Sequence, residues 1–355
     1  MTGQRASALR EQPGHREAAL SELVTEPVAR PDGSDGAAAD ALAGATGAPG
    51  YLSRFDAWHD RASIRVKPHR VLTPGEAIYF SPELAPWATH PLVTERGEQA
   101  VRRVLIRRLF DYLHFTTELE QLAVIPIATR IARGRSGLEL PAAMQADAFK
   151  IVTDEAWHAQ FSFDLLRQVE ATTGVSCGSP VLPAFVTRLD QIRASLDPSV
   201  RGLESLLFAI VSETLISSIL VDLPRDSRLP PAVRELVADH AQDEGRHHSY
   251  FWSLLQHLWP QLSTDQRAAV GPQLPAIIQA FLLPDAHAIR DELRELRLSQ
   301  DELDEVAGAS IAAVVDRGDI AVAAKAAVRY FSEVGAIGDS RTRDAFVAAG
   351  LVLDG

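Results

Sequence analysis

The sequence predicts a mainly α fold, a bundle of long helices, on three observations. Apolar residues between Glu95 and Arg133 recur at the three- and four-residue spacing of a helix, and most later segments repeat this spacing. No stretch alternates apolar and polar residues over several strands. Glycines and prolines fall between the periodic segments, where helices end. With 355 residues, 46% of them hydrophobic, the chain can bury a sizeable core.

The boundaries of the helices follow from these signals. Pro126 should kink or locally break the first helix, because proline lacks the N–H that an internal turn needs. Gly174 and Pro260 are expected to end the second and fifth helices, and Ser299 is a plausible N-cap. In order, the predicted helices are 95–133, 140–173, 183–196, 198–223, 230–259, 264–282 in two pieces, 286–296, 300–315 and 320–334.

The part of the chain before these helices differs in composition. Residues 1–48 are rich in Ala, Gly, Asp and Glu and contain no Phe, Trp or Tyr, which predicts a disordered tail. Residues 51–91 carry Pro, Trp and Phe without a clean period. They predict an irregular packed segment, with a short strand at 64–66 or 77–80.

Charge and cysteine content exclude several classes of protein. The 47 acidic residues outnumber the 35 basic ones and give a net charge of −12, which argues against nucleic-acid or membrane-surface binding. Cys177 is the only cysteine, so the chain has neither an internal disulfide nor the thiolates of an iron–sulfur cluster. No secretory signal and no long apolar run is visible, so a cytoplasmic protein without a membrane span is expected.

Two predicted helices repeat one motif, in the segments DEAWH and DEGRH: an Asp followed by Glu-x-x-His. Residues i and i+3 of a helix lie on one face, so each Glu and its His aim at the same point. A single such pair is commonly solvated, but two of them on long helices indicate a metal site. The motif residues are Asp154, Glu155 and His158 in the first segment, and Asp243, Glu244 and His247 in the second.

A site for two metal ions needs one further Glu from each of two other helices. Glu213 lies in the apolar segment AIVSETLISSIL, where a lone acid is costly unless it is paired or bound to a metal. In the first helix, Glu120 has Ala123 and Ile127 on its face and is favoured, whereas Glu118 is the more polar alternative. Such carboxylate-rich ligation with few His suits iron or manganese better than zinc or copper.

His240 is a further candidate. It lies one helical turn before Glu244 on the same face, where it is either a core histidine or a seventh protein ligand. As a ligand it would give one metal more nitrogen donors than the other.

The aspartates that precede the two motif glutamates have a predicted supporting role. A metal-bound His usually donates its second ring N–H to a carboxylate. Asp154 is therefore expected to serve His247, and Asp243 to serve His158, across the bundle. Arg246 should either pair with one of these aspartates or remain exposed.

The segments FTTELEQLAVIPIATRIARG, KIVTDEAWHAQFSFDLL, SETLISSIL and ADHAQDEGRHHSYF resemble the p-aminobenzoate N-oxygenase family. That family has a Glu, then DExxH, then a Glu, then HxxxExxH. In this sequence these positions are filled by Glu120, Glu155, His158, Glu213, His240, Glu244 and His247.

The resemblance implies a ferritin-like di-iron bundle at about 95–259 with additional C-terminal helices, in a single domain spanning 49–355. It further implies two iron ions, with manganese as a possible substitute, and O₂ as co-substrate. A small aromatic amine would be oxidised to hydroxylamine, nitroso and nitro products in natural-product biosynthesis. An external electron donor and a homodimer are also implied, with no catalytic residue beyond the metal ligands.

Other readings of the same ligands remain open. Another di-iron oxidase, hydroxylase or desaturase could use the same set, and the substrate could be a nitrogen heterocycle or an aliphatic amine. The small subunit of class I ribonucleotide reductase needs a tyrosine where this chain has Ser162. Iron storage is disfavoured by the length of the chain and by the helices after Trp259.

Overall fold

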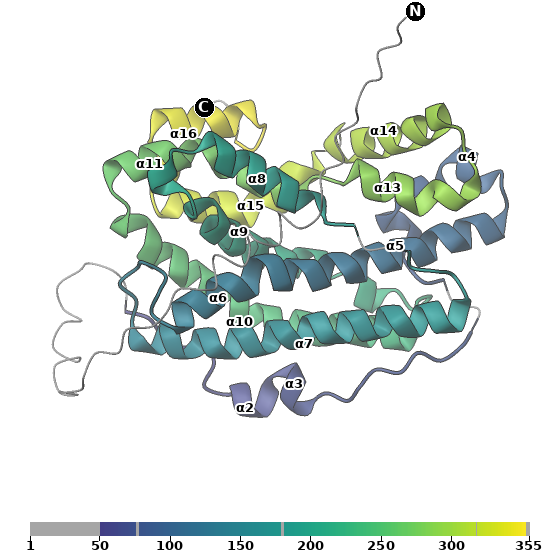
Figure 1. Cartoon of the computed structure of the whole chain (residues 1–355), viewed down its shortest axis with the longest axis horizontal. Coiled ribbons are helices and arrows are strands. Elements are labelled where there is room, and N and C mark those ends of the chain that lie inside the picture. The colour runs from purple at the N-terminus through teal and green to yellow at the C-terminus, as the bar shows by residue number, and fades with distance from the viewer. Residues whose placement is uncertain (1–49, 76–77, 179–180, 317, 353–355) are drawn as a thin grey trace, which may run out of the picture. The chain divides into compact units, whose positions relative to one another are not determined.

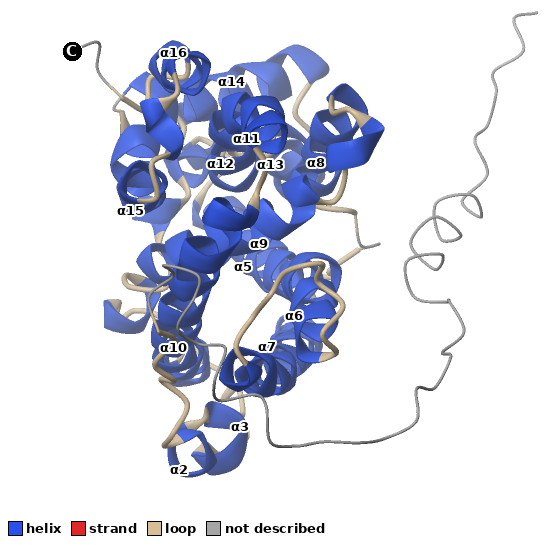
Figure 2. Ribbon diagram, turned by 90° about the vertical axis from the view of Figure 1, so that its left-hand side faces the viewer, coloured by secondary structure: helices blue, strands red, loops and turns tan. Residues whose placement is uncertain are grey.

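The computed structural model describes residues 50–75, 78–178, 181–316 and 318–352. The predicted tail, 1–48, lies outside these residues. The described residues form helices joined by loops and contain no strand (Figure 2). The prediction of a mainly α fold is therefore confirmed. None of the described helices is both long and apolar enough to cross a membrane.

The centre of the fold is a bundle of long helices (Figure 1). Its members contact one another in pairs: α7 with α5, α6 and α10, and α9 with α10. The bundle consists of α5 (Glu98–Leu119), a π-helical segment (Glu120–Val124), α6 (Ile125–Ala132), α7 (Ala142–Thr173), α9 (Leu203–Ile219) and α10 (Pro231–Gln261).

The expected break at Pro126 takes the form of the π segment, directly before this proline. The N–H of Ile125 donates to the carbonyl of Glu120, five residues back rather than four. Proline at position 126 cannot donate to the carbonyl of Leu122, so the regular ladder is interrupted there in any case. Single π turns inside α-helices occur frequently at functional sites, and this one begins at a predicted metal ligand.

Most helix ends lie near their predicted positions. Gly174 ends α7 in the left-handed conformation, with a φ of 66°. The predicted end of the fifth helix before Pro260 is wrong, because α10 continues to Gln261. Pro260 lacks the N–H that would donate to the carbonyl of Gln256, and the helix ends one residue after it. Ser299 Oγ accepts from the N–H of Glu302, and the Glu302 carboxylate accepts from the N–H of Ser299, which confirms the predicted N-cap.

The predicted strand at 64–66 is wrong. These residues belong to the short helix α3 (Ser63–Val66), which follows α2 (Trp58–Arg61). The described residues offer no strand with which they could pair, and the N–H groups of Arg65 and Val66 bond to the carbonyl of Ala62 instead. Residues 78–80 have no regular structure, and Ala77 lies outside the described residues.

The remaining helices cover the bundle on one side (Figure 1). Helices α12 and α15 pack on α9, and α13 packs on α5. The last helix, α16, was not predicted from the sequence. These helices are α8 (Ala184–Ser195), α11 (Thr264–Val270), α12 (Leu274–Leu282), α13 (Ala286–Leu293), α14 (Gln300–Asp316), α15 (Asp319–Glu333) and α16 (Ser340–Ala348); the short α4 (Pro91–Thr94) precedes α5.

Candidate metal centre

Seven acidic and histidine side chains converge inside the bundle. They come from the π segment, α7, α9 and α10, and each is at most 1% exposed. Their potential ligand atoms form three overlapping groups, each with all atoms within 4.8 Å of one another. The groups are Glu155, His158, Glu244 and His247; Glu120, His158 and His240; and Glu120, Glu155 and Glu213.

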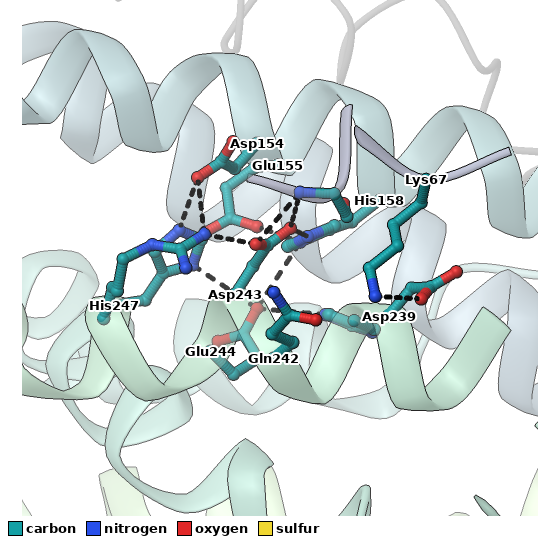
Figure 3. A network of polar contacts seen from close by, with 12 residues as sticks. Lys67, Asp154, Glu155, His158, Asp239, Gln242, Asp243, Glu244 and His247 are labelled. Carbon is teal, nitrogen blue, oxygen red and sulfur yellow. Dashed lines mark hydrogen bonds and ion pairs between the residues drawn. The ribbon is translucent and has the colours of Figure 1, made fainter. Parts of the chain in front are cut away.

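The two Glu-x-x-His motifs face each other across the bundle (Figure 3). One carboxylate oxygen of Glu155, Oε2, lies 2.7 Å from His158 Nδ1. The other, Oε1, lies 2.8 Å from His247 Nδ1. Glu244 Oε1 lies 3.4 Å from both of these nitrogens. Each glutamate thus lies between the two histidines.

Glu120, rather than Glu118, belongs to the cluster. The side chain of Glu118 is 24% exposed and lies 3.9 Å from His114 Nδ1. Residues two apart on a helix point about 200° away from each other, so only one of the two glutamates can face the interior. Of the two alternatives that the sequence left open, the structure therefore places Glu120 in the cluster and Glu118 outside it.

The two ends of the cluster differ in their donors. His240 Nε2 lies 3.9 Å from Glu120 Oε1, and the rings of His240 and His158 have centroids 4.2 Å apart. At the other end, Glu213 Oε2 lies 3.7 Å from His247 Nδ1. One end therefore offers two histidines and the other offers one.

Unsatisfied polar atoms show that this cluster fits metal ions. Among the described residues, eight buried atoms of the cluster make no hydrogen bond of proper geometry, although two pairs of them lie close together: Glu155 Oε1 and His247 Nδ1 at 2.8 Å, and His240 Nε2 and Glu244 Oε1 at 3.0 Å. A buried polar atom without a partner costs free energy, and a buried carboxylate needs a counter-charge. Four glutamates supply four negative charges, which two divalent ions would neutralise. The atoms are Glu120 Oε2, Glu155 Oε1, both Oε atoms of Glu213, His240 Nε2, both Oε atoms of Glu244, and His247 Nδ1.

The four carboxylates differ in acidity. Burial raises the pKa of Glu120 and Glu213 well above the ordinary value, and the charges of Glu155 and Glu244 raise it further. Burial is the largest influence on Glu155 and Glu244 and acts in the same direction, but the neighbouring histidines together outweigh it. The pKa of Glu155 is therefore lowered, and that of Glu244 lies well below the ordinary value. Without metal, Glu120 and Glu213 therefore keep their protons up to a higher pH than ordinary carboxyl groups do.

Metal binding is expected to release these protons, because a carboxylate must be deprotonated to act as a ligand. Since the pKa of Glu120 and Glu213 is raised, metal affinity should rise with pH over the range in which the metal-free protein still binds the protons. Calorimetric titration with Fe(II) or Mn(II) in buffers of different ionisation enthalpy measures the number released. An affinity and a proton count independent of pH would contradict this prediction.

The histidines of both motifs are held from outside the cluster by aspartates. His158 Nε2 lies 3.2 Å from Asp243 Oδ2, and His247 Nε2 lies 3.2 Å from Asp154 Oδ2, which is the pairing that the sequence suggests. Arg246 donates to Asp243 and lies 3.9 Å from Asp154, so it contacts both carboxylates. With Nε2 donating outward, the Nδ1 atoms keep their lone pairs for the cluster.

Sequence reasoning missed three residues that contact this outer layer. Trp58 Nε1 lies 2.9 Å from both carboxylate oxygens of Asp154. The backbone N–H of Ser63 lies 3.2 Å from both oxygens of Asp243. The ring of Phe55 stacks on His247, with centroids 6.1 Å apart and planes at 12°. No sequence signal could have found these contacts, because nothing in the spacing relates residues 96 and 180 positions apart.

This chain is similar to a known protein family and to one named oxygenase. The sequence pattern of the family described as p-aminobenzoate N-oxygenase AurF matches residues 55–327, a range that contains all seven clustered residues. The 4-aminobenzoate N-oxygenase of Streptomyces thioluteus is 25% identical over 214 residues, which cover 59% of this chain and 63% of that protein. The match thus spans less than two thirds of that relative's length. Since the family pattern covers most of the chain, the chain belongs to the p-aminobenzoate N-oxygenase AurF family.

Proposed function

We propose that this protein is a di-iron, O₂-dependent N-oxygenase that converts a small aromatic amine to its hydroxylamine, nitroso or nitro product. The observation that carries the proposal is the buried cluster of four glutamates and three histidines, in which eight polar atoms make no hydrogen bond of proper geometry. Family membership supports the reaction class, and the name of the Streptomyces thioluteus relative supports an aromatic amine as substrate.

The geometry suggests how the ligands are divided between two ions. Glu155 and Glu244 would be available to both ions, because each lies between the two motif histidines. When bound, two iron ions supply the electrons that activate O₂ for transfer to nitrogen. The donor set is also compatible with manganese as a substitute. The remaining ligands are Glu120, His158 and His240 for one ion, and Glu213 and His247 for the other.

The chain's own contribution is to position the ions and exclude water. The seven ligands are at most 1% exposed, so charges inside the cluster interact in a medium of low dielectric. No residue beyond the ligands is assigned a catalytic role. Cys177 is the only cysteine, so the chain cannot bind an iron–sulfur cluster that would supply electrons. An external electron donor is therefore part of the proposal. A homodimer is proposed as well, and a mass measurement in solution tests it.

Rapid mixing tests the proposed function. Iron-loaded, chemically reduced protein is mixed with O₂ in a stopped-flow spectrophotometer, with and without p-aminobenzoate, and products are identified by mass spectrometry. We expect a visible band that decays faster when the amine is present, together with hydroxylamino or nitro product. A band whose decay is not accelerated by any of the amines tested would instead indicate another di-iron oxidase, hydroxylase or desaturase. Absence of iron binding would reject the metal centre itself.

His240 offers a sharper test of the reaction class. His240→Ala should retain two metal ions, because Glu120 and His158 remain at that end of the cluster. Product formation should fall by about tenfold or more, because one ion loses a nitrogen donor. Iron content and single-turnover product are measured together. His257→Ala is a matched control, since His257 is also buried on α10 but bonds to the Ser253 carbonyl. Parent-like turnover of His240→Ala would identify His240 as a packing residue.

A further inference from the structure

Residues 55–63, here called the cap, lie against both aspartate–histidine pairs of the metal centre. The cap contains Phe55, α2 and the first residue of α3. Trp58 contacts Asp154 behind His247, and Ser63 contacts Asp243 behind His158. Two residues five positions apart in the sequence therefore reach the two ends of the cluster through two different aspartates.

The contacts are specific in their chemistry. The indole N–H of Trp58 is a donor only, and it is shared between both oxygens of Asp154. One of these oxygens, Oδ2, also faces His247 Nε2, at 3.2 Å. An N–H that bridges the two oxygens restricts rotation of the carboxylate, and the orientation of the carboxylate in turn fixes the ring of His247.

The second contact uses the backbone. The N–H of Ser63 is equidistant from the two oxygens of Asp243, at 3.2 Å, and one of these oxygens faces His158 Nε2. Asp154, Asp243 and both histidines are fully buried, so water cannot substitute for a lost donor without a rearrangement. Phe55 closes the same side by stacking on His247.

We propose that the cap is a positioning element of the metal centre, in which Trp58 and Ser63 hold the two aspartates that orient His247 and His158 toward the ions. The inference rests on the metal centre of the proposed function but not on its substrate. It predicts that removing either donor weakens metal binding without replacing any ligand.

The first test is Trp58→Phe, which removes the indole N–H and keeps an aromatic ring. Outer partners of metal ligands typically contribute 10- to 100-fold in affinity, and Trp58 acts through one such partner, so we expect the Kd for Co(II) to rise about tenfold. Anaerobic titration against a chromophoric chelator measures the Kd. The visible absorption of the Co(II) protein should also change, because it reports ligand geometry.

Trp87→Phe is the matched control for this substitution. Trp87 is buried, and its indole N–H also donates to a buried carboxylate, that of Glu292, which is not part of the cluster. Both variants should lose thermal stability, but only Trp58→Phe should change the Kd and the Co(II) spectrum. In an Asp154→Asn background, Trp58→Phe should have little further effect on the Kd, because it acts through Asp154.

The second test removes the backbone donor. Ser63→Pro deletes the N–H at the first position of α3, where proline is well tolerated. The preceding residue, Ala62, has φ −61° and ψ 138°, the extended conformation that proline requires before it. Ser63→Ala keeps the N–H and is the control. We expect weaker Co(II) binding in Ser63→Pro only, with a spectral change distinct from that of Trp58→Phe, because a different histidine is affected.

The outcomes separate the cap from the metal centre. If the parent protein binds two ions and both Trp58→Phe and Ser63→Pro keep its Kd within about twofold and its Co(II) spectrum, the cap inference is overturned and the metal centre stands. If the parent binds no metal, both proposals fail. Should Trp58→Phe not fold, the comparison of Ser63→Pro with Ser63→Ala decides the matter alone.

Discussion

Glu244→Ala is expected to remove both metal ions and to reduce amine oxidation to the level of the metal-free protein. Glu244 Oε1 lies 3.4 Å from His158 Nδ1 and from His247 Nδ1, so the carboxylate serves both ends of the cluster. The pKa of Glu244 is well below the ordinary carboxyl value, because His247 and His240 outweigh its burial. It therefore stays ionised in the empty site, and its loss would remove a charge that is available to both ions of the proposed centre.

Metal analysis of the purified protein after anaerobic loading measures this effect. We expect less than about one tenth of the parent's iron, since removal of a shared ligand costs more than the 10- to 100-fold typical of outer partners. Glu118→Ala is the control, because Glu118 lies two residues from a ligand but is partly exposed and points away. A Glu244→Ala protein that still holds two ions would show that Glu244 is not a shared ligand.

Glu213→Leu is expected to lose most of the iron and, at the same time, to make the metal-free protein more stable. Both carboxylate oxygens of Glu213 are buried without a hydrogen-bond partner among the described residues, and burial raises the pKa of Glu213. An unsatisfied buried polar group costs about 1–3 kcal/mol, so its replacement by an apolar side chain should raise the free energy of unfolding by about that amount.

Chemical denaturation of the metal-free proteins measures the stability change, and iron analysis measures the loss of metal. Glu204→Leu on the same helix is a matched control, for which we expect the opposite change in the free energy of unfolding. Glu204 is equally buried, but its carboxylate accepts from Arg193 Nε and from the N–H of Gly202, both at 2.7 Å. Its replacement should destabilise the protein. If Glu213→Leu retained full iron, or destabilised the protein as Glu204→Leu does, Glu213 would be a structural residue.

Stability that rises when a site residue is removed is a general mark of function. A fold selected for stability alone would not gather four glutamates in its interior. In this protein the free-energy cost of burying carboxylates arises in the cluster, and bound metal ions would offset it.

The helices and the donor set could be predicted from the sequence, because both depend on local rules. Helical spacing is visible over any 11 to 18 residues, and it places Glu155 with His158, and Glu244 with His247, on one face before the fold is known. Glu213 stood out for an equally local reason, since it is a lone acid in an apolar helix. The structure brings all of these side chains together.

Other features depend on how a segment packs against the rest of the protein, and there the sequence patterns gave wrong or incomplete predictions. The residues at 64–66 were predicted to form a short strand, yet they belong to α3, and no described strand is available to pair with them. Pro260 was expected to end a helix that continues to Gln261. The sequence also favoured Glu120 over Glu118 only by the polarity of its neighbours, whereas burial in the structure separates the two residues.

By itself, the sequence determined the fold class, the two Glu-x-x-His motifs and the residues able to complete a two-metal site, because each of these follows from spacing within one helix. Only the tertiary structure decided which atoms meet: the shared positions of Glu155 and Glu244 and the contacts of Trp58 and Ser63 with the aspartates. The physical reason is that these contacts join residues far apart in the chain. The packing of one helix against another determines these contacts, and the periodicity of the sequence carries no information about that packing.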